Sequence, residues 1–155
     1  LGPDALTIGF ARRAATYKRA ALILDAPDFV ARLVNDPQRP IQFVFAGKAH
    51  PRDDNGKELI RNIVRSAAAL RESVRIAFVP NYDIDLGQLL TAGVDLWLNT
   101  PRRPHEASGT SGMKAAVNGV LNCSILDGWW CEGHDPSHGW SIVANEEAEH
   151  DHIRE

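Results

Sequence analysis

Short apolar runs that suit buried β-strands alternate along this sequence with longer runs that suit α-helices. The strand-like runs lie at 6–11, 41–47, 74–80, 94–99 and 120–126. Helix-like runs lie between them at 15–26, 27–36, 56–72 and 84–93, and a last one within 103–122. Parallel strands need long crossover connections, usually helices, so this alternation constrains the fold strongly. The sequence predicts an α/β fold: a Rossmann-like parallel sheet with helices on both faces.

The length and net charge of the chain limit the classes of protein to which it can belong. Its 155 residues suffice for one domain with a substantial core, and its net charge of -3 gives no signal for nucleic-acid binding. The apolar runs are far shorter than a membrane span, so no membrane partner is predicted. Cys123 and Cys131 lack the spacing of a metal site, and we expect them to be free thiols in a reducing cytoplasm.

Three features predict that residues 1–155 are a single Rossmann-like domain truncated from a larger enzyme. Met113 is the only methionine, and the first predicted strand begins with almost no lead-in. The chain ends in a polar, helix-prone stretch at 145–155.

The parallel sheet also predicts where chemistry should occur. In open parallel sheets, ligands bind outside the carboxyl ends of the strands, near a switch in strand order. The loops after the predicted strands are therefore the candidate regions. They are 12–18, 47–56, 80–85, 100–113 and 127–140.

The loop at 100–113 leads into the segment RPHEASGTSGMKAAVNGVLN, at 103–122. Gly109 and Gly112 permit positive φ angles and close approach of the main chain. A helix that begins there points free N–H groups and a partial positive charge at its surroundings, which favours a phosphate site. A flexible loop with an ordinary Ser or Thr cap is the alternative interpretation.

Lys114 lies in the first turn of this predicted helix, among the apolar residues Met113, Ala115, Ala116 and Val117. A cation is unfavourable at a helix N-terminus, so one interpretation is a special role, and the other is a lysine on the polar face. A desolvated lysine amine readily forms an imine with a carbonyl compound. An aldehyde that also carries a phosphate would use both halves of the motif, and pyridoxal 5'-phosphate is such a cofactor.

A basic cluster follows the first predicted strand. It consists of Arg12, Arg13, Lys18 and Arg19, within the stretch ARRAATYKR. Cations at the carboxyl end of a strand suit a dianion such as phosphate, because guanidinium groups bind oxygens in pairs. A solvated basic face is the alternative.

Other candidate residues give weaker signals. Tyr82, after the third predicted strand, could pack against a ligand ring or simply fill a loop. Lys48 and His50, after the second, could contact a ligand, but a turn at Gly47 also explains that stretch.

The stretch LDGWWCEGHDPSHGWSI, at 126–142, contains His134 and His138. No carboxylate or third histidine accompanies them at a convincing spacing, so we predict no metal site there. We expect its aromatic residues to form a lid or to pack against the edge of the sheet. The EHDH run at 149–152 is interpreted as a solvated tail.

Four stretches, in order and spacing, resemble the α-glucan phosphorylases, the glycogen, starch and maltodextrin phosphorylases. They are GFARRAATYKRAALIL, FAGKAHP, FVPNYD and NTPRRPHEASGTSGMKAAVNGVLNCSILDGWW, and the resemblance spans about residues 6–143. It implies the C-terminal one of two Rossmann-like domains that face a cleft. It also implies an activity: orthophosphate cleaves a terminal α-1,4-linked glucose with retention and gives glucose 1-phosphate.

The resemblance further implies residues that bind pyridoxal 5'-phosphate. The cofactor would be held as an imine on Lys114, with Thr110 and Ser111 forming a cradle for its phosphate. Arg12 stands near that phosphate, where the family usually has lysine. Tyr82 matches a tyrosine close to the cofactor. The cofactor phosphate would touch the substrate phosphate and transfer a proton.

The substrate-binding residues follow in the same way. Arg13 and Lys18 match the ligands of the substrate phosphate, and we expect them, with Lys114, to be the catalytic residues. Tyr17 matches a tyrosine close to the glucose. Groups that hold glucose hydroxyls correspond to Glu106, Ser108 and Gly109. Asp83 departs from the basic residue that many members carry after the tyrosine.

Two alternatives remain open at the level of sequence. One is a retaining glycosyltransferase that uses a sugar nucleotide, like glycogen synthase, in which Glu106 and the glycine loop would serve a nucleotide diphosphate. The other is a domain without catalytic activity that binds glucan or phosphate. For the preferred interpretation, we expect residues 1–155 alone to be inactive and the full-length enzyme to be a possible homo-oligomer.

Overall fold

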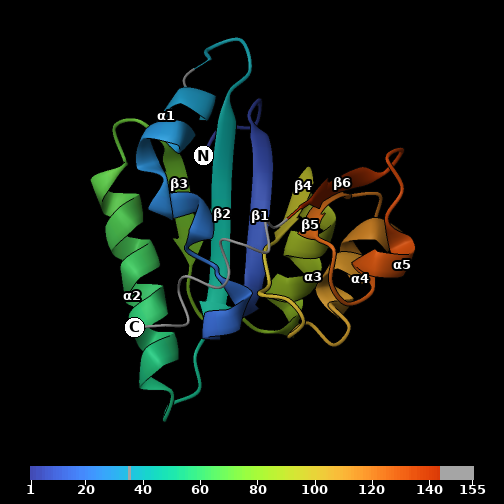
Figure 1. Cartoon of the computed structure of the whole chain (residues 1–155). Coiled ribbons are helices and arrows are strands. Elements are labelled where there is room, and N and C mark those ends of the chain that lie inside the picture. The colour runs from blue at the N-terminus through green and yellow to red at the C-terminus, as the bar shows by residue number, and fades with distance from the viewer. Residues whose placement is uncertain (35, 144–155) are drawn as a thin grey trace.

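The computed structural model describes residues 1–34 and 36–143 (Figure 1). Six strands form one all-parallel sheet in the order β3-β2-β1-β4-β5-β6. They are β1 (Leu6–Arg13), β2 (Ile41–Lys48), β3 (Arg75–Val79), β4 (Leu96–Asn99), β5 (Leu121–Ile125) and β6 (Gly139–Ile142). The order reverses between β1 and β4, as in Rossmann folds, so the predicted Rossmann-like α/β fold is confirmed.

Helices cover both faces of the sheet. In Figure 1, α1 and α2 lie on one side, and α3 and α4 on the other. The helices are α1 (Pro27–Val34), α2 (Asp54–Ala69), α3 (Ile84–Gly93), α4 (Thr110–Val117) and the short α5 (Trp130–Gly133). This arrangement follows from right-handed crossovers, which place the helices before and after a reversal of strand order on opposite faces.

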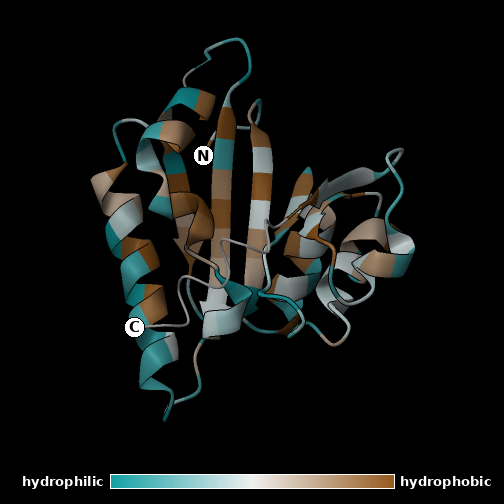
Figure 2. Cartoon of the chain, in the orientation of Figure 1, coloured by the Kyte–Doolittle hydropathy of each residue, from teal (hydrophilic) through white to brown (hydrophobic). Residues whose placement is uncertain are grey.

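The core is divided between these two faces because side chains alternate along each strand. Phe10 and Phe43 pack in one cluster with Ile63 of α2. Ala11, on the opposite face of β1, packs in a second cluster with Ala115 of α4. Figure 2 shows the result: β1 and β2 are largely apolar, whereas hydrophilic and hydrophobic residues alternate along α2.

The predicted helix at 15–26 is wrong. Two short 3-10 helices, η1 (Thr16–Lys18) and η2 (Leu22–Asp25), occupy this stretch instead. They are separated by Arg19, whose φ of 47° lies in the left-handed region. The side chain of Arg19 donates to the carbonyl oxygens of Thr100 (3.1 Å) and Pro101 (3.0 Å). These contacts with a distant loop hold a turn in a sequence whose local preference is helical.

Helix α5 lies within the predicted loop at 127–140, and a sixth strand, β6, begins at the end of that loop. Strand β6 pairs with β5 at the edge of the sheet. A Cβ atom on Gly139 would collide with the carbonyl oxygen of Asn122 and with the Trp130 ring, so only glycine allows this strand to approach. Trp130 is fully buried. The expectation that the aromatic residues pack at the sheet edge therefore holds for Trp130.

Other expectations concern cysteines, metals and membranes. Cys123 and Cys131 are both free thiols, as predicted. Within the described part of the chain, no three or more His, Cys, Asp or Glu side chains gather in a group that could hold a metal ion. Nor does any helix there have both the length and the apolar character needed to cross a bilayer. The EHDH run at 149–152 lies outside the described residues.

Candidate phosphate and cofactor site

A pocket of about 1080 Å³ lies at the carboxyl end of β1, where the strand order reverses. Its walls come from the end of β1, the beginning of α3, the loop after β4 and the beginning of α4. Every residue that the family resemblance assigned to the site lines this pocket. They are Arg12, Arg13, Tyr17, Lys18, Tyr82, Glu106, Ser108, Gly109, Thr110, Ser111 and Lys114.

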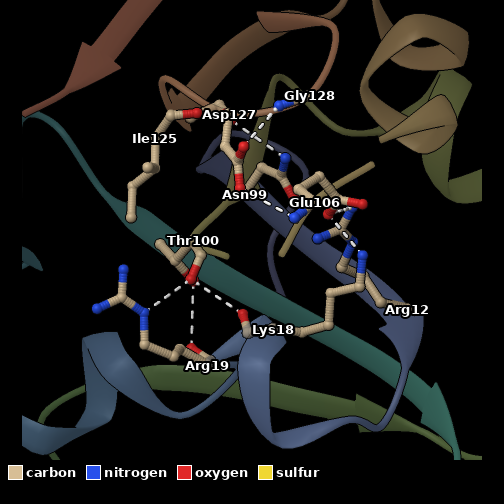
Figure 3. A network of polar contacts seen from close by, with 10 residues as sticks. Arg12, Lys18, Arg19, Asn99, Thr100, Glu106, Ile125, Asp127 and Gly128 are labelled. Carbon is tan, nitrogen blue, oxygen red and sulfur yellow. Dashed lines mark hydrogen bonds and ion pairs between the residues drawn. The ribbon is translucent and has the colours of Figure 1, made fainter. Parts of the chain in front are cut away.

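A buried ion cluster lies among the residues that line the pocket (Figure 3). Oε2 of Glu106 lies 2.8 Å from Nη2 of Arg12 and 2.5 Å from Nζ of Lys18. The side chains of Arg12 and Glu106 are each 6% exposed and that of Lys18 is 11% exposed. Charges so far from water are tolerated only when they are paired, so Glu106 is the counter-ion of both cations.

Burial opposes the positive charge of Arg12. Desolvation lowers the pKa of its guanidinium, and the charge of Glu106 opposes this shift. A guanidinium remains protonated at any physiological pH. Nη1 of Arg12 is buried and has no partner within the described residues. Arg12 therefore retains an unused donor for an anion.

The turn that carries Lys18 is tied to the segment after β4. Besides the two hydrogen bonds of Arg19, the hydroxyl of Thr100 lies 3.3 Å from the carbonyl oxygen of Lys18 and donates to it (Figure 3). The N–H of Arg102 donates to the carbonyl oxygen of Tyr17 over 2.7 Å. The Lys18 ammonium also lies over the Tyr17 ring, 4.6 Å from its centroid, in a cation–π contact. These contacts direct Lys18 into the pocket.

The N-terminus of α4 opens on the pocket without a side-chain cap. Gly109 is the N-cap residue, and its φ of 82° confirms the predicted positive φ. The first N–H groups of a helix have no partner inside the helix, so they remain available to an anion. The hydroxyl of Ser111 is buried and unpartnered within the described residues.

Gly112 has a different role from the predicted one. Its φ lies outside the left-handed region, and a Cβ atom there would lie 2.8 Å from Nε1 of Trp129 and 2.9 Å from Oδ1 of Asn122. Packing against the protein interior, and not approach to a ligand, explains this glycine.

Lys114 lines the pocket, but its side chain is exposed. Of the two interpretations of Lys114, the structure therefore shows an exposed lysine and not a desolvated one. Arg13 is exposed as well and lines the same pocket. Arg12 and Lys18 are thus buried and paired with Glu106, whereas Arg13 and Lys114 are exposed and form no ion pair within the described residues.

Tyr82 packs against the first turns of α3. Its hydroxyl lies 3.1 Å from the position that a Cβ atom on Gly87 would occupy. Burial raises the pKa of the Tyr82 phenol, and the positive charge of Arg12 opposes this shift. Tyr82 therefore stays protonated at neutral pH and can donate a hydrogen bond.

Comparison with known proteins shows the family of this chain. The sequence profile of the carbohydrate phosphorylases matches residues 4–135. The chain belongs to the carbohydrate phosphorylase family. It is 56% identical over 140 residues to a glycogen phosphorylase of Mycobacterium tuberculosis, covering 90% of this chain and 16% of that protein.

Further relatives carry related names. A maltodextrin phosphorylase of Thermococcus litoralis is 51% identical over 98% of this chain and 19% of its own length. A glycogen phosphorylase of Aquifex aeolicus is 51% identical over 92% of this chain and 20% of its own length. The chain thus spans no more than about a fifth of these relatives.

The sequence did not predict some of the residues that line the pocket of this phosphorylase-family chain. Gln88 and Thr91, on α3, line the pocket because α3 begins in the loop after β3. A helix register drawn from that loop could have indicated them. Lys48 and His50 do not line the pocket. His138 lies elsewhere and contacts the carbonyl oxygen of Gly133 through Nε2, at 2.7 Å.

Proposed function

We propose that this chain forms the phosphate- and cofactor-binding part of an α-glucan phosphorylase. In this enzyme, orthophosphate cleaves the terminal α-1,4-linked glucose of a glucan and releases glucose 1-phosphate. One observation carries the proposal: a single pocket at the strand-order reversal gathers Arg12, Arg13, Lys18 and Lys114 in front of the uncapped helix α4. The names of the relatives support the same reaction class.

The residues present fit pyridoxal 5'-phosphate. The amine of Lys114 lines the pocket and suits the aldehyde group. The phosphate group suits the N-terminus of α4 at Thr110 and Ser111. Two buried donors without a partner in the described residues, Nη1 of Arg12 and the Ser111 hydroxyl, add to the donor set. When bound, this cofactor supplies a phosphate group that exchanges a proton with the substrate phosphate.

The charge of the pocket suits a second phosphate group, that of the substrate. Four cations and two carboxylates, Glu106 and Asp83, line it, which leaves a formal surplus of two positive charges. Two phosphate groups held close together repel each other strongly, and this surplus offsets the repulsion. We assign Arg13 and Lys18 to orthophosphate. They also stabilise the negative charge that develops as the glycosidic bond breaks.

The glucose ring would lie against the loop after β4. Both ion pairs of Glu106 use Oε2, and within the described residues Oε1 accepts no hydrogen bond. Oε1 is therefore available to a sugar hydroxyl, with Ser108 and Gly109 beside it on the loop. We assign Tyr17 to the same subsite, since its ring lines the pocket next to Lys18.

We infer that residues 1–155 alone have no useful activity. Lys114 and Arg13 are exposed, so the described part of the chain does not exclude water from the reacting groups. A second domain of the longer enzyme would close the cleft. We also place that enzyme in the cytoplasm, since the free thiols Cys123 and Cys131 suit a reducing compartment.

Reduction with borohydride followed by peptide mass mapping tests the proposal. The chain and the longer enzyme are incubated with pyridoxal 5'-phosphate, reduced and digested. We expect a pyridoxyl adduct on Lys114, and none there in Lys114→Ala. The matched control is Lys48→Ala, which removes a lysine outside the pocket and should leave the adduct unchanged.

The outcomes separate the alternatives. An adduct in the longer enzyme only would mean that both domains are needed to hold the cofactor. The absence of an adduct on Lys114 in both proteins would refute the phosphorylase proposal and favour a transferase that uses a sugar nucleotide.

A further inference from the structure

Asp127 is a buried carboxylate that lies behind the pocket and does not line it. It follows β5, and both of its oxygens accept main-chain hydrogen bonds (Figure 3). Oδ2 accepts the N–H of Glu106 over 2.9 Å, and Oδ1 accepts the N–H of Gly128 over 3.0 Å. Within the described residues Asp127 forms no ion pair. A buried charge without a cation is costly, so the two N–H groups must hold it in place.

The residues after Asp127 contact the loop after β4, which carries Glu106 and Ser108. The N–H of Trp129 donates to the carbonyl oxygen of Ser108 over 2.8 Å. Gly128 has a φ of 57°, and a Cβ atom on it would lie 2.6 Å from that carbonyl oxygen and 3.1 Å from Cγ of Glu106. Residues 127–129, the clamp segment, therefore contact the loop that carries Glu106 and Ser108 at three points.

The clamp segment fixes the main chain on one side of Glu106, while the side chain of Glu106 meets Arg12 and Lys18 on the other. The side chain of Glu106 has a limited reach, so its carboxylate cannot keep its ion pairs with both Arg12 and Lys18 if the Cα atom of Glu106 moves. The position of the main chain at Glu106 thus decides whether its carboxylate can reach Arg12 and Lys18.

We propose that Asp127 is the positioning residue for Glu106, and that it acts on sugar binding only through Glu106. The proposal rests on the phosphorylase function inferred above. A carboxylate is needed because both of its oxygens face N–H donors. An asparagine offers one acceptor oxygen and one NH₂ group, so it leaves one of the two N–H groups facing another donor.

Hydrogen exchange tests the geometry in the chain itself, without any ligand. In the wild-type chain we expect the amide of Glu106 to be protected from exchange. In Asp127→Asn this protection falls by about tenfold or more, while the strand amides of β1 keep theirs. The matched control is Asp135→Asn, which alters an exposed carboxylate that also accepts a main-chain N–H, that of Ser137, at 2.8 Å. The control should leave the Glu106 amide unchanged.

A double-mutant cycle in the longer enzyme tests the function. We expect Asp127→Asn to lower kcat/KM by about 10- to 100-fold, the size of effect that a small misplacement of a positioned group produces. The loss should come with a raised KM for glucose 1-phosphate and an unchanged pyridoxyl adduct on Lys114. In a Glu106→Gln background, Asp127→Asn should lower kcat/KM by less than about twofold, because the residue it positions is already disabled.

Three results would overturn the positioning role: unchanged protection of the Glu106 amide, an additive loss in the double mutant, or loss of the Lys114 adduct. If the wild-type enzyme lacks both the adduct and phosphorolysis, the proposed function fails instead. Should Asp127→Asn not fold, Asp127→Glu serves in both experiments, because it keeps the charge but displaces both carboxylate oxygens from the N–H groups of Glu106 and Gly128.

Discussion

Replacing Glu106 by glutamine should destabilise the chain far more than removing a carboxylate from its surface. Glutamine has nearly the same shape as glutamate, but it carries no charge and offers a single acceptor oxygen. In Glu106→Gln, Arg12 and Lys18 would remain buried, at 6% and 11% side-chain exposure, without their shared counter-ion.

The size of the effect follows from the burial of this cluster. Removing one partner of a buried ion pair typically costs about 3–5 kcal/mol of folding free energy. Lys18 lines an open pocket and has a flexible stem, so it can turn toward water, and we expect the lower end, about 3 kcal/mol. Domains of this size unfold with a free energy of about 5–15 kcal/mol, so the loss is a large fraction of the total.

Urea unfolding followed by circular dichroism measures this loss. With a slope of about 1–3 kcal/mol per molar urea, a cost of about 3 kcal/mol lowers the midpoint by about 1–3 M. The matched control is Glu58→Gln on α2. Glu58 forms ion pairs with Arg61 and Arg65, but all three side chains are well exposed, so the change should cost less than about 1 kcal/mol.

The result that would refute this reasoning is a similar midpoint shift in the two variants. It would show that water reaches Arg12 and Lys18 freely, and that the cluster is not a buried counter-ion site. The slope must also stay constant between the variants, because a changed slope would indicate a different unfolded or native state.

Two further predictions concern the core and the thiols. Gly9→Ala should cost about 1–3 kcal/mol in the same urea experiment, because the new Cβ atom would lie 2.8 Å from a methyl group of the buried Val94, whereas Gly93→Ala meets no atom within 4 Å and should cost nothing. Iodoacetamide should label the exposed Cys131 before Cys123, as peptide mapping would show, because burial raises the pKa of Cys123 above its ordinary value of 9.0. Equal labelling rates of the two thiols would contradict the raised pKa of Cys123. The stability contributed by the neutral Cys123 thiol should be fully present below about pH 9 and lost as the pH rises further, which urea unfolding at several pH values would measure.

The local pattern of the sequence determined the class of fold and the region of the site. Apolar strand-like runs separated by amphipathic helices can bury their surfaces only in a parallel sheet covered on both faces, and the structure confirms this. Because parallel strands end at one edge, the cations after β1 and the glycine loop after β4 had to approach each other. Both conclusions depend on periodicity and on residues close together in the chain, which a sequence displays directly.

Contacts between distant parts of the chain decided the rest. The helical preference of 15–26 gave way to hydrogen bonds from Arg19 to the segment after β4, 81 residues and more away. The short strand β6 forms because Gly139 fits against Asn122. Sequence periodicity is too weak over four residues to reveal such a strand.

The same holds within the site. The sequence left a desolvated and an exposed Lys114 as alternatives, and the family resemblance implied that Glu106 holds glucose hydroxyls. The structure exposes Lys114 and makes Glu106 the counter-ion of two buried cations. The role of Asp127 arises only where the end of β5 meets the loop after β4. Burial and pairing of charge depend on which segments meet in space, and that is a property of the tertiary structure alone.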